Sequence, residues 1–394
     1  MTRNCGAIIF SALSVALAAA PAHSFQTEAS EPGPFSTVEF RFAADAALVF
    51  AAADYGGSTL ADLDLRFEWE GISDNGWRWG AELGLQAQKD SPREGFADRA
   101  APAAGARRSL ATGRYTGGVR ETRDSAFAAS RANLFLRTGW GELRAGLTPG
   151  AAAVETVPMP TGSAYVRLDG GPLAPPYGAA IRTANLASAL GPSLVYTTPR
   201  IVGLSASASF TPETSYCGID VCGDPGNAGG LPSARLDSVF EAALSFDHTF
   251  NTAGRVRLGA NIARAEPVSP LFPDNYVAYG LQARWSREGW HAGVSALWAD
   301  NAVSDGEYAA VMTALRYDFG DWSVGAEWAQ AEDDYLGEAQ SAAQFTISRL
   351  IGNEFSVAFG LHDIDTDLPP SPALPIELNS RKGFGAFFEV AFSR

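Results

Sequence analysis

The chain has 394 residues, of which 46% are hydrophobic and 19% are charged. Its formal charge is −15, from 44 acidic and 29 basic residues, which argues against a nucleic-acid partner bound by phosphate neutralisation. The only apolar run lies within the first 22 residues, so a bundle of membrane-spanning helices is excluded.

The first 24 residues have the pattern of an export signal. Arg3 supplies a positive charge, residues 7–20 are almost entirely apolar or small, and either Ala20-Pro21-Ala22 or Ala22-His23-Ser24 offers a cleavage site of the A-x-A kind. An uncleaved anchor is the alternative, but the stretch is too short and wrongly flanked for a spanning helix. Loss of Arg3 changes the formal charge from −15 to −16. We expect residues 1–24 to be a signal peptide and residues 25–394 to form the mature domain.

Two cysteines remain in the mature chain, Cys217 and Cys222, within a Gly- and Pro-rich stretch. A close pair in an exported chain favours a disulfide inside one loop. A metal site is the alternative, but no second Cys/His pair accompanies the first. We therefore expect a disulfide, no metal and no cofactor.

Hydrophobic and polar residues alternate along most of the chain. Between Ala61 and Glu70 every odd position is apolar and every even position is charged, and the pattern resumes at Trp77 after a turn at 73–76. Successive side chains of a β-strand point to opposite faces, so alternation predicts strands with one apolar and one polar face. The turn between these two segments predicts a hairpin.

The same pattern predicts sixteen strands, joined by connections that alternate between short and mostly longer ones. This arrangement is typical of an even-stranded antiparallel barrel. The predicted strands are 37–50, 60–70, 77–88, 126–138, 141–148, 193–199, 202–212, 235–247, 255–264, 276–286, 290–299, 307–319, 322–329, 341–349, 353–362 and 381–392.

Charges in the middle of many strands show which face meets water. Arg66, Arg131 and Arg144 lie on the polar face, and a mid-strand charge facing lipid costs about 2–4 kcal/mol. They must therefore face a water-filled lumen. All nine tryptophans fall near predicted strand ends, as in the aromatic girdles of a membrane barrel, whereas a soluble β-sandwich gives no such pattern.

The connection 149–192 is more than forty residues long and rich in Pro, Gly and Ala. Connections of this length are uncommon and tend to be functional. It is either a disordered surface loop or a segment folded back into the lumen. We expect the second, and hence an all-β fold: a 16-stranded antiparallel transmembrane β-barrel with its long third loop inside.

Two segments, 132–146 and 193–205, resemble the strand–turn–strand units on either side of the third loop in trimeric Gram-negative general porins, particularly the alphaproteobacterial ones. The resemblance implies a homotrimer, and a third loop whose acids face an arginine cluster on the wall. The connection 89–125, with Arg93, Arg107 and Arg108, is the expected contact with a neighbouring subunit. The implied constriction residues are Arg41, Arg66, Arg78, Arg131, Arg144, Glu155 and Asp169.

These features predict a passive, water-filled channel in the outer membrane for small hydrophilic solutes and ions, weakly preferring cations. Outer-membrane lipid and lipopolysaccharide would surround it. We expect Asp363, Asp365 and Asp367 on an acidic loop that divalent cations bridge to lipopolysaccharide, because the distal Glu and the Gly of a calcium loop are missing. A substrate-specific porin for a sugar or another nutrient is the alternative.

A barrel enzyme is the less favoured alternative. Only His248, His291 and His362 follow the signal segment securely, and no G-x-S-x-G, H-E-x-x-H or phosphate-loop motif occurs. Scattered histidines are more often structural than catalytic.

Overall fold

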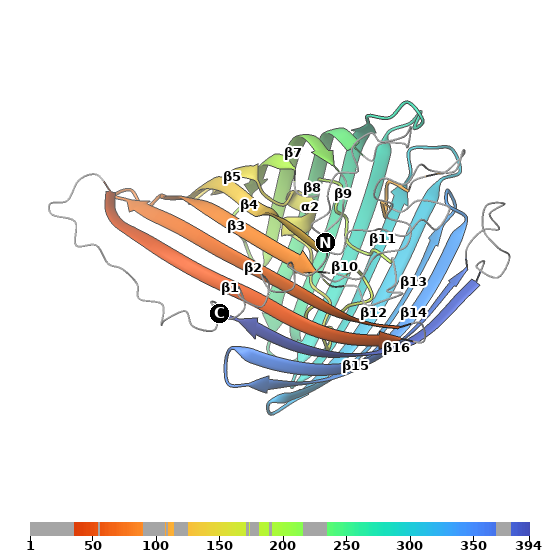
Figure 1. Ribbon diagram of the computed structural model, residues 1–394. Helices are drawn as coiled ribbons and strands as arrows, with labels where there is room; N and C mark the ends of the chain where they lie inside the picture. Colours follow the sequence, from red (N-terminus) through yellow and green to blue (C-terminus); the bar gives the residue numbers. More distant parts are fainter. Residues whose placement is uncertain are drawn as a thin grey trace, which may run out of the picture.

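The structure, a computed structural model, describes residues 35–53, 56–89, 107, 109–113, 125–170, 173, 181–188, 191–215, 235–367 and 380–394. In these residues sixteen antiparallel strands form one closed barrel, and a single short helix, α2 (Ala151–Val154), lies beside β7 and β8 (Figure 1). The expected signal segment 1–24 and the cysteines Cys217 and Cys222 lie outside the described residues. No helix in the described ranges is long and apolar enough to cross a membrane.

All sixteen predicted strands are present and in the predicted order. The strands are β1 (Phe35–Ala53), β2 (Gly56–Ser73), β3 (Arg78–Lys89), β4 (Ser125–Thr138), β5 (Gly141–Leu147), β6 (Pro192–Thr197), β7 (Leu204–Ser215), β8 (Arg235–Phe250), β9 (Gly254–Pro267), β10 (Tyr276–Arg287), β11 (Trp290–Asp300), β12 (Glu307–Phe319), β13 (Trp322–Asp333), β14 (Glu338–Ile351), β15 (Phe355–Asp367) and β16 (Ser380–Ser393).

One expectation at the end of β15 is wrong. Asp363, Asp365 and Asp367 belong to this strand and not to a loop, and Asp365 pairs with Lys382 of β16 at 2.7 Å. The alternation continues through this stretch, since Ile364 is buried between them. The acids therefore lie on the outer face of the barrel, where the pleat places every second residue.

The barrel closes between its first and last strands. Asp45 of β1 stands opposite Ser393 of β16, and the pairing runs to Ala53 opposite Gly385. The strand pairing is shortest around β5, β6 and β7, where β6 and β7 pair only over Leu194–Thr197 against Ser207–Phe210. The long connection 148–191 leaves the barrel wall at this side.

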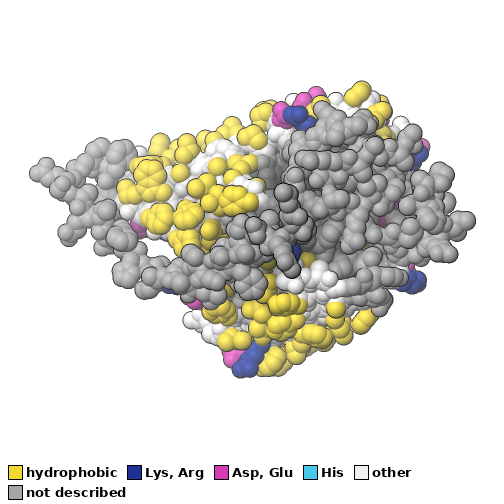
Figure 2. Space-filling view, in the orientation of Figure 1, with side chains coloured by type: hydrophobic (Ala, Val, Ile, Leu, Met, Phe, Trp, Pro, Cys, Tyr) yellow, Lys and Arg dark blue, Asp and Glu magenta, His cyan; other side chains and the backbone are white. Residues whose placement is uncertain are grey.

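The outer face of the barrel is apolar. Phe40, Phe42, Phe384 and Phe388 are exposed on it, and Figure 2 shows hydrophobic side chains crowding the outer surface. Tryptophans near the strand ends are exposed too, with Trp140 at 84%. An apolar band flanked by aromatic side chains is the surface that a lipid bilayer solvates best.

The inner face has two sectors of different chemistry. On β1–β5 it carries charged side chains, of which Asp64, Arg66 and Arg131 are half-buried and Asp62 and Glu70 are buried. On β8–β16 most of it carries buried small, polar and aromatic side chains, among them Ala278 and Ala329, while half-buried arginines such as Arg257 and Arg284 lie near the short turns. Something inside the barrel must therefore cover the second sector.

That cover is the connection between β5 and β6, together with residues 109–113. Leu168, Ile181 and Ala187 of the connection join Leu110 and Ala111 in one buried apolar cluster with inward-facing residues of β8–β15. A second cluster joins Val166 and Leu173 to inward-facing residues of β1, β2 and β16. Apolar burial thus fixes the connection along most of the wall.

Candidate functional site

The residues of the long connection that the structure describes between 149 and 188, namely 149–170, 173 and 181–188, are called segment 149–188 below. This segment is held to the wall by a buried glutamate on β8. Glu241 accepts hydrogen bonds from the backbone N–H of Ala152 (3.1 Å) and of Ser188 (3.0 Å), and from the hydroxyl of Ser209 (3.1 Å). Its side chain is 4% exposed. One carboxylate therefore ties the beginning and the end of the segment to the same point, with charge-assisted bonds that are stronger than neutral ones.

Two further wall glutamates hold the middle of segment 149–188. Glu327 of β13 accepts from the backbone N–H of Gly162 at 3.3 Å. Glu389 of β16 accepts from the hydroxyl of Ser163 (2.5 Å) and from the N–H of Tyr165 (3.3 Å). These contacts attach the segment to the inner face at β13 and at the last strand, β16.

Glycines on the wall let the segment approach this closely. A Cβ on Gly293 of β11 would lie 2.6 Å from Pro160 Cδ, and one on Gly325 of β13 would lie 2.9 Å from the Cα of Gly162. Such distances are far inside van der Waals contact, so only glycine allows the backbone of the segment to lie flat here.

The two acids expected to line a constriction are turned to the wall in the structure. Glu155 is 7% exposed, and its carboxylate accepts from the hydroxyls of Ser205 (2.9 Å), Ser207 (2.7 Å) and Ser245. Asp169 is 8% exposed and pairs with Arg167 at 3.2 Å. Both carboxylates contact the barrel or their own segment, and neither stands free opposite the arginines of β1–β5.

Tyr165 lies where the segment reaches farthest across the inner face, beside the first and last strands. Burial, together with the carboxylates of Asp45 and Asp62, raises the pKa of its phenol above the ordinary value. The phenol therefore stays neutral at physiological pH, close to the first two strands. The segment thus spans the inner face from β7 to β1 and covers Leu60 of β2, and it leaves the charged part of β2–β5 uncovered.

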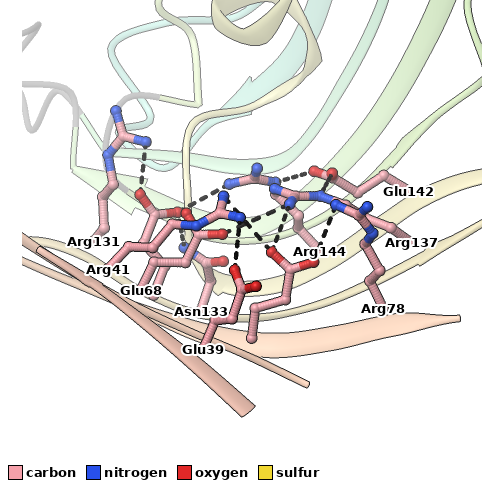
Figure 3. A network of polar contacts seen from close by, with 11 residues as sticks. Glu39, Arg41, Glu68, Arg78, Arg131, Asn133, Arg137, Glu142 and Arg144 are labelled. Carbon is pink, nitrogen blue, oxygen red and sulfur yellow. Dashed lines mark hydrogen bonds and ion pairs between the residues drawn. The ribbon is translucent and has the colours of Figure 1, made fainter. Parts of the chain in front are cut away.

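The expected arginines lie on the uncovered face and form a network with carboxylates (Figure 3). Glu70 of β2, 2% exposed, lies 3.4 Å from Arg78, 3.7 Å from Arg137 and 3.9 Å from Arg41. Arg41 also pairs with Glu39 at 3.1 Å, so the opposite charges of these two groups neutralise each other. One buried carboxylate thus collects three guanidinium groups.

A second junction of the network is Glu82 of β3. Its two oxygens accept from Arg131 (3.0 Å) and Arg144 (2.9 Å), and Asn133 donates to it at 3.3 Å. Figure 3 shows Arg137 and Arg144 both directed toward Glu142 of β5, to which each donates. These contacts hold the guanidinium groups in fixed positions, whereas arginines on an exposed, flexible surface can change position.

Arg66 stands apart from this network, farther along β2. It donates to Asp45 of β1 and, at 3.1 Å, to Asp64 of β2. Asp62, the next inward carboxylate, accepts from Gln86 at 2.8 Å. Carboxylates outnumber guanidinium groups along the whole inner face of β1–β5. The groups are Glu39, Asp45, Asp62, Asp64, Glu68, Glu70, Glu82 and Glu142 against Arg41, Arg66, Arg78, Arg131, Arg137 and Arg144.

An open cavity of about 560 Å³ lies between this network and the start of segment 149–188. Arg131, Arg137 and Arg144 line it on the strand side, and Ala153 and Val154 of α2 line it on the other. The cavity combines fixed charges with an apolar wall, so water and small polar solutes can occupy it.

Arg137 and the carboxylates that neutralise the arginines are not among the residues expected from the sequence. Arg137 has the same inward parity on β4 as Arg131, because the one-residue register shift opposite Gly84 and Leu85 falls before Arg131. The alternation of apolar Leu136 with charged Arg137 therefore indicates in the sequence that Arg137 faces inward. The partners Glu70 and Glu82 also carry the inward parity, but their pairing depends on the register between strands.

Part of the connection between β3 and β4 contacts its own chain. Asn301 accepts from the N–H groups of Leu110 (2.7 Å) and Ala111 (3.1 Å), and Arg107 donates to the carbonyl of Tyr335 (3.0 Å). Residues 109–112 are buried by these contacts. The described part of this connection therefore packs against its own barrel, and its expected contact with a neighbouring subunit stays a prediction; Arg93 and Arg108 lie outside the described residues.

A closed barrel with an apolar outer face and a charged, partly covered inner face defines an outer-membrane channel protein. The chain belongs to the Gram-negative porin family, whose model, described as Gram-negative porin, matches residues 11–349. No curated protein matches it in sequence.

Solved structures of porins share the fold. A porin refined at 1.8 Å resolution is 16% identical, covering 90% of this chain and 100% of its own, with a TM-score of 0.53. The trimer form of OmpT, an outer-membrane protein of Vibrio cholerae, is 11% identical over 91% and 99%, with a TM-score of 0.56. An anion-selective porin from Comamonas acidovorans is 12% identical over 91% and 100%, with a TM-score of 0.54.

Proposed function

We propose that this porin is a general diffusion channel, passive and water-filled, for small hydrophilic solutes and ions, with a weak preference for cations. The observation that carries the proposal is the contrast between the two inner sectors. The segment and its apolar clusters cover most of β8–β16 and part of β1 and β2, whereas the charged face of the remaining β1–β5 wall borders a cavity. Charged side chains on an open inner face hydrate a pore.

The narrow part of this channel is then formed by segment 149–188 on one side and the arginine–carboxylate network on the other. In this proposal Arg41, Arg66, Arg78, Arg131 and Arg144 line the path. Glu155 and Asp169 act differently from the sequence-based expectation, because their buried carboxylates position the segment. Fixed charges at a waist select among solutes by charge and size.

The cation preference follows from the excess of carboxylates on the open face and from the net charge of −15. Each guanidinium group there has a carboxylate within 4 Å, so the positive charges are locally neutralised. The surplus of negative charge attracts counter-ions from solution. The preference is weak because the two signs alternate.

Liposome swelling with neutral sugars of increasing mass tests the general character of the channel. We expect the rate to fall smoothly with mass, with equal rates for sugars of equal mass, because no binding step intervenes. Zero-current potentials in a KCl gradient are expected to have the sign set by K⁺ moving down its gradient. Absence of conductance, or a clearly chloride-selective potential, would contradict the proposal.

A substrate-specific sugar channel is the second candidate, and one sugar passing faster than its mass allows would favour it. Sugar channels need exposed aromatic faces, but Phe135, Tyr308 and Phe387, the inward aromatics noted in the sequence, are at most 4% exposed. Phe135 lies beneath the guanidinium of Arg137, 4.5 Å from the ring centroid.

Enzymatic activity is not part of the proposal. Ser286, His291 and Asp318 do form a hydrogen-bonded chain, with 2.8 Å from Ser286 Oγ to His291 Nδ1 and 3.0 Å from His291 Nε2 to Asp318. All three lie on paired strands, so the backbone N–H groups that would form an oxyanion hole are in or beside β-ladders. These three hydrogen-bonded side chains are better explained as polar contacts that link β10, β11 and β12.

We further propose a homotrimer surrounded by outer-membrane lipid and lipopolysaccharide, exported by residues 1–24, with a disulfide between Cys217 and Cys222. The exposed apolar face of β1–β5, including Phe127 and Leu134, supports burial against lipid or a second copy. The mass of the mature protein, before and after reduction and alkylation, checks the signal and the disulfide together.

A further inference from the structure

A row of arginines lies on the inner face of β9, β10 and β12, opposite the uncovered wall of β1–β5. Arg257 of β9 stands directly across from Arg284 of β10 in the ladder. Arg316 of β12 continues the row, and each arginine lies three or four residues from a short turn. This row, Arg257–Arg284–Arg316, was not expected from the sequence and plays no part in the constriction proposed above.

Two members of the row have carboxylate partners. Asp247 pairs with Arg257 at 3.1 Å and also with Arg255 at 2.5 Å. Asp318 pairs with Arg316 at 2.6 Å. Three guanidinium groups thus share two carboxylates here.

Arg284 is the member that has none. Within the described residues, no carboxylate lies within 4 Å of its guanidinium group, which donates a hydrogen bond of 3.3 Å to the carbonyl of Pro158. The positive charges of Arg257, Arg316 and Arg255 act on it unfavourably, against a weaker attraction from Asp318. Like charges held together on a wall of low polarity are costly unless an anion joins them.

The row is fixed in place by its surroundings. Arg284 stands opposite Gly293 on β11, over which Pro160 and Met159 of segment 149–188 pack, so the segment lies directly beside Arg284. Arg316 is held in place from three directions, by Asp318, by Ser323 (3.0 Å) and by the carbonyl of Thr161 (3.3 Å). The row is therefore positioned by strands and by segment 149–188, not by mobile loops.

We propose that the Arg257–Arg284–Arg316 row is a binding site for small oxyanions, that is, solutes carrying a carboxylate or phosphate group. Guanidinium groups match these groups because two N–H donors meet two oxygens of one ligand. The site rests on the proposed channel function, since solutes reach it through the lumen. Within a weakly cation-preferring pore, this row is one place where small oxyanions bind transiently.

The test uses the wild-type protein in planar bilayers, with inorganic phosphate, succinate or glucose added at constant ionic strength. We expect phosphate and succinate to reduce the KCl current with a defined midpoint, and glucose to have no such effect. Arg284→Gln should raise the midpoint for both anions about tenfold, and Arg284→Lys should raise it less, because the charge remains but the fork is lost.

Arg349→Gln is the matched control. Arg349 lies near the same end of the barrel but on the outer face, 5.2 Å from the ring centroid of Trp322. Its removal should leave the midpoints unchanged. Equal midpoints in wild type and Arg284→Gln, or equal effects of glucose and the anions, would overturn the site. A wild-type protein without any KCl current would instead contradict the channel itself, so the two failures are distinguishable.

Discussion

Replacing Glu241 with alanine is expected to release both ends of segment 149–188 from the wall. The substitution leaves the N–H groups of Ala152 and Ser188 without their acceptor in a buried place. Each such loss costs about 1–3 kcal/mol, so the free energy of unfolding should fall by about 2–6 kcal/mol. Urea titration of the protein in lipid vesicles measures this difference.

The open-channel current of Glu241→Ala should also become noisier, because the released segment moves within the pore. Glu332→Ala is the control, since Glu332 is an exposed carboxylate on the outer face of β13. The control should match wild type in stability and in noise. If Glu241→Ala behaved like the control in both measurements, the anchoring role of Glu241 would be wrong.

Replacing Glu82 with glutamine is expected to shift the selectivity of the channel toward anions. Glu82 neutralises Arg131 and Arg144, and glutamine keeps its shape while removing its charge. A unit charge acts on an ion 4 Å away in water by about 1 kcal/mol, which is roughly a fivefold change in local concentration. The permeability ratio of K⁺ to Cl⁻ should therefore fall about two- to fivefold, as measured from zero-current potentials.

The effect of Glu82→Gln should shrink at high salt, because added ions screen the exposed charges. Glu332→Gln removes the same charge from the outer face and should leave the ratio unchanged. A ratio equal to that of wild type in Glu82→Gln would show that the β1–β5 wall does not line the ion path.

The alternation of apolar and polar residues predicts the strands well because a pleated strand turns successive side chains to opposite faces. The inward parity of Arg66, Arg131 and Arg144 follows from the same geometry. The row containing Arg284 carried the same signal, and its distinct position could be found by comparing how far each arginine lies from a short turn.

The orientation of residues in the long connection could not be predicted in this way. Glu155 belongs to an irregular segment without a repeating period, and its partners Ser205, Ser207 and Ser245 come from distant strands. The anchors Glu241 and Glu389 have inward parity, but their partners are mainly backbone N–H groups of the segment, which leave no trace in the sequence. Only the packed fold brings these groups together.

The most direct test of the account is whether the inner face of β5 is the wall of a water-filled path. Single cysteines at Arg144 and at its outward neighbour Leu143, in a protein with Cys217 and Cys222 replaced by serine, are treated with a charged, water-soluble thiol reagent during single-channel recording. Leu143 is 41% exposed on the outer face. Modification of Arg144→Cys is predicted to lower the conductance in discrete steps, while Leu143→Cys stays unaffected. An unchanged conductance at position 144, with its modification confirmed by mass, would contradict the account.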